Sequence, residues 1–220
     1  MHEMCYDKED MNVELNFEKR HRFVREVIET AVLTILMFLV INLAIQNFNI
    51  QGTSMEPHLH NLERLMVDKG SYVLHTPARG DVIVFVAPPQ PDQDYVKRII
   101  AIPGDVISVD NGRPTVNGVT LNEPYVDPQR MGASPTDRPV QDLVVPPDEY
   151  FVMGDNRRGS YDSRSWGFMP RKNIIGRATL VYWPLGMDNN GFLPDVSAVF
   201  AAVEQRATAR NSTDAEERQH

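Results

Sequence analysis

A serine and a lysine in this chain could together hydrolyse an amide bond. Ser54 lies in a turn-like stretch rich in glycine and proline, just after the longest apolar run of the sequence. A serine hydroxyl becomes a nucleophile when a base takes its proton, and a lysine amine is such a base only when it is neutral. The pKa of lysine, ordinarily about 10.4, must therefore fall by about three units, which burial and a nearby cation can achieve.

Lys97 has surroundings that favour the neutral form. In an extended strand, Tyr95, Lys97 and Ile99 share one face, so the amine would lie among apolar side chains. Both residues also have ordinary structural interpretations, a serine in a turn and a lysine that reaches solvent from a strand edge. On the residue pattern alone these interpretations remain open.

Other hydrolytic chemistries have less support in the sequence. His58, His60 and His75 lie in no recognisable triad setting, and no G-x-S-x-G elbow surrounds Ser54. The single cysteine, Cys5, can form no intramolecular disulfide, and no cysteine and histidine have the spacing of a zinc site. We therefore expect neither a metal nor another cofactor.

A long apolar run precedes Ser54 and indicates a membrane anchor. Residues 31–48 carry no charge and, at about 1.5 Å each in a helix, span roughly 27 Å, close to a bilayer core. The run is apolar on nearly every face, unlike a core helix, and it lacks the small-x-small exit of a cleaved signal. We predict a single transmembrane helix over residues 27–48.

The charges beside this run predict its orientation. Lys19, Arg20, Arg22 and Arg25 precede it, and no further cation follows until Arg64. By the positive-inside rule, residues 1–26 stay in the cytoplasm, and everything after the helix lies outside the cell membrane. The net charge of −8 and the absence of a basic cluster after Arg25 argue against nucleic acid as a partner.

After the anchor, the sequence has the character of a mainly β protein. Short β-branched runs alternate with Gly, Pro and Asn-Gly turns, so we expect an antiparallel β-sheet domain over residues 49–186. Residues 71–75 fit a strand, and about 106–147 fit an irregular inserted subdomain. The C-terminal tail, 187–220, contains a candidate short helix over 196–203 and otherwise fits a partly disordered segment.

Three segments resemble the diagnostic boxes of type I signal peptidases, the membrane-bound Ser/Lys proteases that remove signal peptides. Gly52–Pro57 is similar to the serine box, Tyr95–Asp105 to the lysine box, and Gly154–Arg164 to the third box. Two supporting segments, Arg79–Phe85 and Asn117–Val126, also match. The resemblance runs in order from the anchor to about Pro184.

This resemblance implies a set of site residues. Ser54 would be the nucleophile, Lys97 the general base, and the Ser54 backbone N–H a donor to the oxyanion. Gly52 stands where some members have a hydroxyl, so this second donor is absent or comes from elsewhere, and His58 stands where a threonine is frequent. Three further residues would orient the lysine and support the site: Ser160, Asp162 and Arg164.

The resemblance also implies the substrate, the signal peptide of a preprotein at the bilayer surface. An extended peptide points its residues −1 and −3 the same way, so two shallow pockets would admit only small side chains. The apolar residues expected to line them are Ile50, Met55, Tyr95 and Val96.

Two other functions remain open from the sequence. Self-cleaving repressor-type proteins resemble the same Ser/Lys core, but they are cytosolic and need no anchor such as residues 31–48. A membrane-tethered β binding module without catalysis gives no reason for Ser54, Lys97 and the segment Gly154–Arg164 to occur together.

Overall fold

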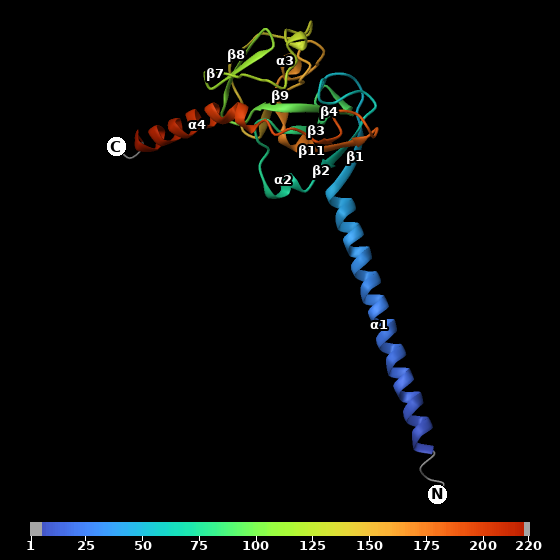
Figure 1. The fold of residues 1–220 in the computed structure, drawn as a ribbon. Coiled ribbons are helices and arrows are strands. Elements are labelled where there is room, and N and C mark those ends of the chain that lie inside the picture. The colour runs from blue at the N-terminus through green and yellow to red at the C-terminus, as the bar shows by residue number, and fades with distance from the viewer. Residues whose placement is uncertain (1–5, 218–220) are drawn as a thin grey trace. The chain divides into compact units, whose positions relative to one another are not determined.

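The computed structural model describes residues 6–217, which divide between Ala44 and Ile45 into two units (Figure 1). Cys5 lies outside the described residues. The first unit holds one helix, α1 (Tyr6–Ala44). Its segment Arg22–Ala44 has a mean hydropathy of 2.3 and is the one helix among the described residues that is long and apolar enough to cross a membrane.

The end of α1 corrects the predicted anchor. Residues 45–48 were expected to continue the helix, but Ile45–Asn49 form strand β1, which pairs antiparallel with β2 (Arg64–Asp68). The apolar run does not end at this boundary, so hydrophobicity alone could not place it. Polar Gln46, Asn47 and Asn49 instead belong to a sheet edge, where polar side chains can face water.

An antiparallel sheet forms the base of the second unit. Its strand order is β1-β2-β11-β3-β4-β9-β10, with β12 paired to β11. The remaining bounds are β3 (Val82–Ala87), β4 (Gln90–Ala101), β9 (Glu149–Met153), β10 (Met169–Pro170), β11 (Ile174–Trp183) and β12 (Gly191–Phe192). The long strand β4 pairs with β3 along most of its length but with β9 only from Arg98 onward. The first half of β4 therefore has a free edge.

A second antiparallel sheet replaces the irregular subdomain that we expected over residues 106–147. Its order is β7-β6-β5-β8. The strands are β5 (Val106–Asp110), β6 (Arg113–Val116), β7 (Val119–Thr120) and β8 (Val140–Val144), and the 3-10 helix η1 (Pro128–Arg130) lies in the connection before β8. Buried Ile107, Val116 and Val140 pack this sheet against Phe151 of β9. The Pro-rich connection concealed β8 in the sequence.

Local hydrogen bonds explain why residues 71–75 are not the strand that we expected. The Asp68 carboxylate accepts the backbone N–H groups of Gly70 and Ser71, at 2.8 and 3.0 Å, and the Ser71 hydroxyl at 2.5 Å. These bonds turn the chain into the short helix α2 (Ser71–Leu74). Two other short helices, α3 (Ser163–Trp166) and η2 (Arg171–Asn173), connect β9, β10 and β11.

The C-terminal segment contains a longer helix than the one predicted. Helix α4 runs over Ser197–Glu217, well beyond the short helix expected at 196–203. Phe200 and Val203 are 1% and 0% exposed in the core beside Ile107, with Val196 and Val199 packed around them. This spacing is that of an amphipathic helix, and Arg206 extends the contact by donating to the carbonyls of Asn117 and Gly118.

Candidate active site

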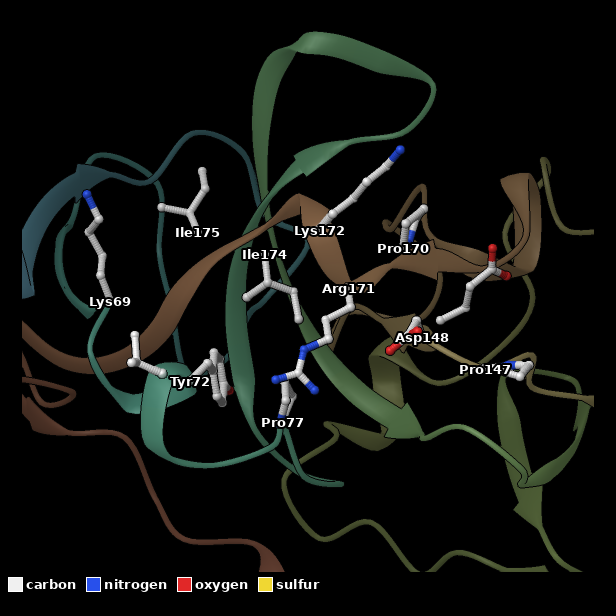
Figure 2. A pocket seen from close by; sticks show the side chains of 12 residues that line it. Lys69, Tyr72, Pro77, Pro147, Asp148, Pro170, Arg171, Lys172, Ile174 and Ile175 are labelled. Atoms are coloured by element: carbon white, nitrogen blue, oxygen red, sulfur yellow. The ribbon is translucent and has the colours of Figure 1, made fainter.

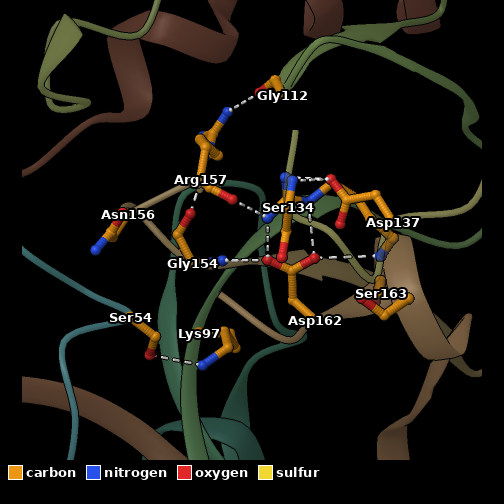
Figure 3. Close-up of polar contacts among 12 residues, drawn as sticks. Ser54, Lys97, Gly112, Ser134, Asp137, Gly154, Asn156, Arg157, Asp162 and Ser163 are labelled. Atoms are coloured by element: carbon orange, nitrogen blue, oxygen red, sulfur yellow. Dashed lines mark hydrogen bonds and ion pairs between the residues drawn. The ribbon is translucent and has the colours of Figure 1, made fainter. Parts of the chain in front are cut away.

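Ser54 and Lys97 meet at the end of the free edge of β4. Ser54 lies in the loop between β1 and β2, and Lys97 is paired with Ile83 on the neighbouring strand β3. The Lys97 Nζ lies 2.8 Å from the Ser54 Oγ and donates to the Val96 carbonyl at 3.0 Å (Figure 3). The structure thus brings the predicted nucleophile within proton-transfer distance of the predicted base.

Burial favours the neutral form of the Lys97 amine. The residue is 4% exposed, and its amine lies 5.1 Å from the centre of the Tyr95 ring. Burial lowers the pKa of Lys97 to about 8, although the carboxylates of Asp162 and Asp155 act in the opposite direction. A substantial fraction of this amine is therefore neutral near physiological pH.

The third box places buried charged side chains next to Ser54 and Lys97 (Figure 3). Asp162 accepts the Arg164 Nε and Nη2 at 2.9 and 2.8 Å and the Gly154 N–H at 3.0 Å. Burial raises the pKa of Asp162, but hydrogen bonds and the charge of Arg164 outweigh it, so this pKa lies below its ordinary value. Arg164 also pairs with Asp137 at 2.9 Å, which ties the box to the preceding connection. Asp162 and Arg164 thus form a buried ion pair.

Ser160 lies beside the dyad but does not make the contact expected of it. Its side chain is 1% exposed, and no hydrogen bond joins its Oγ to Lys97, although Ser160 lies close enough to the Asp162 carboxylate to help lower the pKa of that group. A Cβ added to Gly154 would lie 2.3 Å from this Oγ and 2.5 Å from the Ser54 carbonyl oxygen. Only glycine at this position lets the third box approach the serine so closely.

The four apolar residues predicted to contact substrate lie together with the dyad. They line one cleft of about 660 Å³ that also contains Ser54 and Lys97. Ile50 and Met55 are 5% and 2% exposed, whereas Tyr95 and Val96 are half-buried. The free edge of β4 forms one side of this cleft. One cleft therefore contains all four residues that were predicted to contact the substrate: Ile50, Met55, Tyr95 and Val96.

Comparison with known proteins shows to which family this chain belongs. A family model described as "Signal peptidase, peptidase S26" matches residues 24–183. The chain belongs to this family. It is 40% identical over 164 residues to a signal peptidase I of Leptolyngbya laminosa, covering 69% of this chain and 78% of that protein. It is 38% identical over 180 residues to signal peptidase I P of Bacillus subtilis subsp. natto, covering 77% and 96%.

A solved structure is also similar, a signal peptidase I from Enterococcus faecalis V583. It is 32% identical, its match covers 47% of this chain and 97% of its own, and its TM-score is 0.40. With named relatives that span most of the chain, the protein is an enzyme of the signal peptidase I type.

Several residues of this signal peptidase escaped sequence reasoning because their partners are distant in the chain. Arg98 pairs bidentately with Asp155, at 2.9 and 2.7 Å, and Arg157 pairs with Glu123, at 2.6 and 2.7 Å, with all four side chains buried. Asn156 contacts the serine loop itself. The sequence pointed to these residues only because they lie in segments that resemble those of the family. That resemblance does not say which side chain each of them contacts.

His58, where the family often has threonine, lies apart from the dyad. Its Nδ1 is 3.9 Å from the Asp155 Oδ2 and buried without a hydrogen bond among the described residues. Burial lowers the pKa of His58, and Asp155 partly opposes this effect. The imidazole therefore carries little charge at neutral pH and leaves the Arg98 pair with Asp155 undisturbed.

The signal peptidase has a second pocket, of about 690 Å³ (Figure 2). None of the residues that line it also lines the cleft around Ser54 and Lys97. The second pocket lies between α2, η2 and the start of β11, where Lys69, Arg171 and Lys172 surround Tyr72 and Ile174. It holds no serine paired with a base, so it offers no comparable chemistry. Across residues 6–217, no group of three histidine, cysteine or acidic side chains is placed to hold a metal.

Proposed function

We propose that this chain is a membrane-bound serine endopeptidase that removes signal peptides from exported preproteins by a Ser54/Lys97 mechanism. The observation that carries the proposal is the 2.8 Å approach of the Lys97 Nζ to the Ser54 Oγ within a buried site. The lowered pKa of the lysine supports its role, because a base near neutrality must be free to accept a proton.

The reaction proceeds through an acyl-enzyme. The Ser54 Oγ attacks the carbonyl carbon of substrate residue −1 while its proton passes to the neutral Lys97 Nζ. The tetrahedral intermediate collapses, and the protonated lysine gives this proton to the departing amine of the mature protein. Lys97 then takes a proton from water as the water oxygen attacks the ester carbonyl, and it returns this proton to the Ser54 Oγ as the ester C–O bond breaks and the signal peptide leaves.

The oxyanion of this intermediate needs a donor in the cleft. Within residues 6–217, the Ser54 N–H donates no hydrogen bond to another protein group, so it is free for this role. Gly52, two residues earlier, has no hydroxyl to add, and its own N–H is already bonded to the Asn61 side chain at 2.9 Å. The Ser54 N–H is thus the principal oxyanion donor.

The substrate binds as an added strand along the free edge of β4. Residues −1 and −3 then point into the cleft toward the buried side chains of Ile50 and Met55, where we expect shallow pockets. Tyr95 and Val96 border the same pockets, so small side chains fit and large ones collide with buried residues. This shape favours cleavage after small residues at −1 and −3.

The helix α1 tethers the enzyme to the cell membrane. Its apolar side chains are exposed on the protein, for example Leu33 at 66% and Leu43 at 74%, and a bilayer would cover them. The basic residues between positions 19 and 25 favour a cytoplasmic N-terminus and an extracytoplasmic catalytic unit. This arrangement keeps the cleft on the side where signal peptides emerge.

Cleavage of a preprotein in detergent tests the proposed function. A preprotein with alanine at −1 and −3 should be cut after residue −1, and leucine at either position should lower kcat/KM by about five- to 150-fold, because one overpacked side chain costs about 1–3 kcal/mol. Gel analysis and the mass of the mature product measure both effects. Equal rates for alanine and leucine would contradict the pocket assignment, and no cleavage would contradict the proposed function.

The pH dependence of kcat/KM tests the state of Lys97. Because only the neutral amine accepts the serine proton, activity should rise about tenfold per pH unit in acid and neutral solution and level off above the pKa of about 8. Circular dichroism at each pH controls for unfolding. A flat profile through neutral pH, with the fold intact, would show that Lys97 does not titrate during catalysis.

A further inference from the structure

Asn156 binds the loop that carries the nucleophile through two hydrogen bonds. Its side-chain Nδ2 donates to the Thr53 carbonyl at 3.1 Å, and its backbone N–H donates to the Ser54 carbonyl at 3.0 Å. These two carbonyls belong to the peptide groups on either side of the Ser54 Cα. Asn156 thereby restrains both torsion angles of the nucleophile, φ through the first peptide and ψ through the second.

The first of these bonds also sets the direction of the oxyanion donor. The Thr53 C=O and the Ser54 N–H lie in one trans peptide group and point in opposite directions. Because Asn156 holds the carbonyl on its own side, the N–H must point the other way, toward the substrate. A hydrogen bond to a carbonyl also polarises its amide and strengthens its N–H as a donor.

Asn156 is itself held rigidly enough for this role. It is 7% exposed, and its Oδ1 accepts the Gly159 N–H at 3.1 Å, which fixes the orientation of the amide. The preceding residue, Asp155, is fixed by its bidentate pair with Arg98. Gly154 lies in van der Waals proximity to the Ser54 carbonyl, so the whole segment packs on the loop.

We propose that Asn156 is a positioning residue that aims and polarises the Ser54 N–H as the oxyanion donor. This inference rests on the proposed Ser54 mechanism and extends it to a residue that is not among those lining the cleft. The site depends on such help because Gly52 supplies no second donor. The Glu56 N–H also donates to the Thr53 carbonyl, at 3.2 Å, from within the same loop, whereas Asn156 ties this carbonyl to the third box.

The test compares Asn156→Ala with the wild-type chain in detergent on an alanine-containing preprotein. We expect kcat to fall roughly ten- to hundredfold, somewhat less than the loss of a whole oxyanion donor, with KM nearly unchanged. Asn156→Asp keeps the side-chain volume and the acceptor for the Gly159 N–H but loses the amide donor. Asn156→Asp should show the same loss in kcat. It therefore tests the role of the amide donor even if the alanine variant does not fold.

The inhibition constants of two peptide inhibitors distinguish a role in oxyanion binding from a purely structural role of Asn156. A peptide aldehyde ending in alanine forms a tetrahedral adduct with Ser54 and needs the oxyanion donor, whereas the corresponding alcohol forms no adduct. In the variants, the inhibition constant of the aldehyde should rise by the same factor as kcat falls, and that of the alcohol should stay constant. Equal weakening of both inhibitors would overturn the inference, because Asn156 would then only shape the cleft.

Asn189 offers a matched control. Its Nδ2 also donates to a carbonyl of the serine loop, that of His58, at 2.9 Å, but this peptide lies away from Ser54. Asn189→Ala should therefore leave kcat within about twofold of wild type. If the wild-type chain cleaves the preprotein and Asn156→Ala keeps the full kcat, the inference about Asn156 is wrong but the proposed function stands. If the wild-type chain cleaves no preprotein, the proposed function is wrong.

Discussion

Replacing Lys97 by methionine should abolish preprotein cleavage while leaving the protein folded. Without a base at 2.8 Å, the Ser54 hydroxyl keeps its proton, and removal of one member of such a catalytic unit lowers kcat by about 10⁴-fold or more. Methionine has a similar length, is apolar, and fits a side-chain position that is 4% exposed. The rate is measured by single-turnover cleavage with enzyme in excess.

Ser54→Ala is the matched control for this experiment. It removes the nucleophile instead of the base, and because the two residues act as one unit, the double variant should be no slower than either single variant. The methionine variant should unfold at a temperature no lower than wild type, since it removes an amine whose pKa is lowered by burial. Substantial activity of a folded Lys97→Met variant would require another base.

The proposed pairing of Ser54 with Lys97 followed from the resemblance of two short segments to the family's serine and lysine boxes, because the residue pattern alone left both structural interpretations open. Residues 52–57 and 95–105 carry their own turn and strand signals, and the apolar neighbours of Lys97 on one strand face indicate that it is buried. The distance between Ser54 and Lys97 could not be predicted from the residues alone, because it depends on the placement of the β1–β2 loop against β4.

The support around the dyad was harder to predict for a physical reason. A buried arginine needs a partner, but the sequence does not say which of many carboxylates supplies it, and Arg98 and Arg157 find Asp155 and Glu123 through tertiary contacts. The same limit concealed Asn156, whose role depends on Thr53. Ser160, by contrast, was expected near the dyad, but the predicted bond from its hydroxyl to Lys97 is not formed.

The secondary structure predicted from the sequence was wrong where local residue patterns conflicted with tertiary contacts. The continuous apolar run hid the change from α1 to β1 after Ala44, and the Asp68 carboxylate turned a strand-like segment into α2. The helix α4 was missed over most of its length for another reason. Its polar second half has no apolar stripe, and only the packing of Phe200 and Val203 shows where it docks.

Removing one partner of the buried pair of Arg157 and Glu123 should strongly destabilise the fold. Both side chains are 0% exposed, and Glu123 also accepts the Tyr125 hydroxyl at 2.6 Å. Arg157 in turn donates to the Gly112 carbonyl at 2.7 Å and to the Gly154 carbonyl at 3.0 Å. The pair therefore connects the small sheet to the third box.

Glu123→Gln should lower the free energy of unfolding by about 3–5 kcal/mol, because it leaves the Arg157 charge buried without a counter-ion. Tryptophan fluorescence during denaturation in detergent measures this loss. Arg177→Gln is the matched control, since Arg177 is 52% exposed in its pair with Asp81 and should cost less than about 1 kcal/mol.

The double variant Glu123→Leu/Arg157→Met separates the two possible reasons for such a loss. If the loss comes from an unpaired buried charge, removing both charges should restore much of the stability, because apolar residues of similar volume fill the same space. Cleavage should recover less, since Arg157 no longer holds the Gly154 carbonyl beside Ser54. A double variant as unstable as Glu123→Gln would instead show that the hydrogen bonds of Arg157, and not the balance of charge, stabilise the third box.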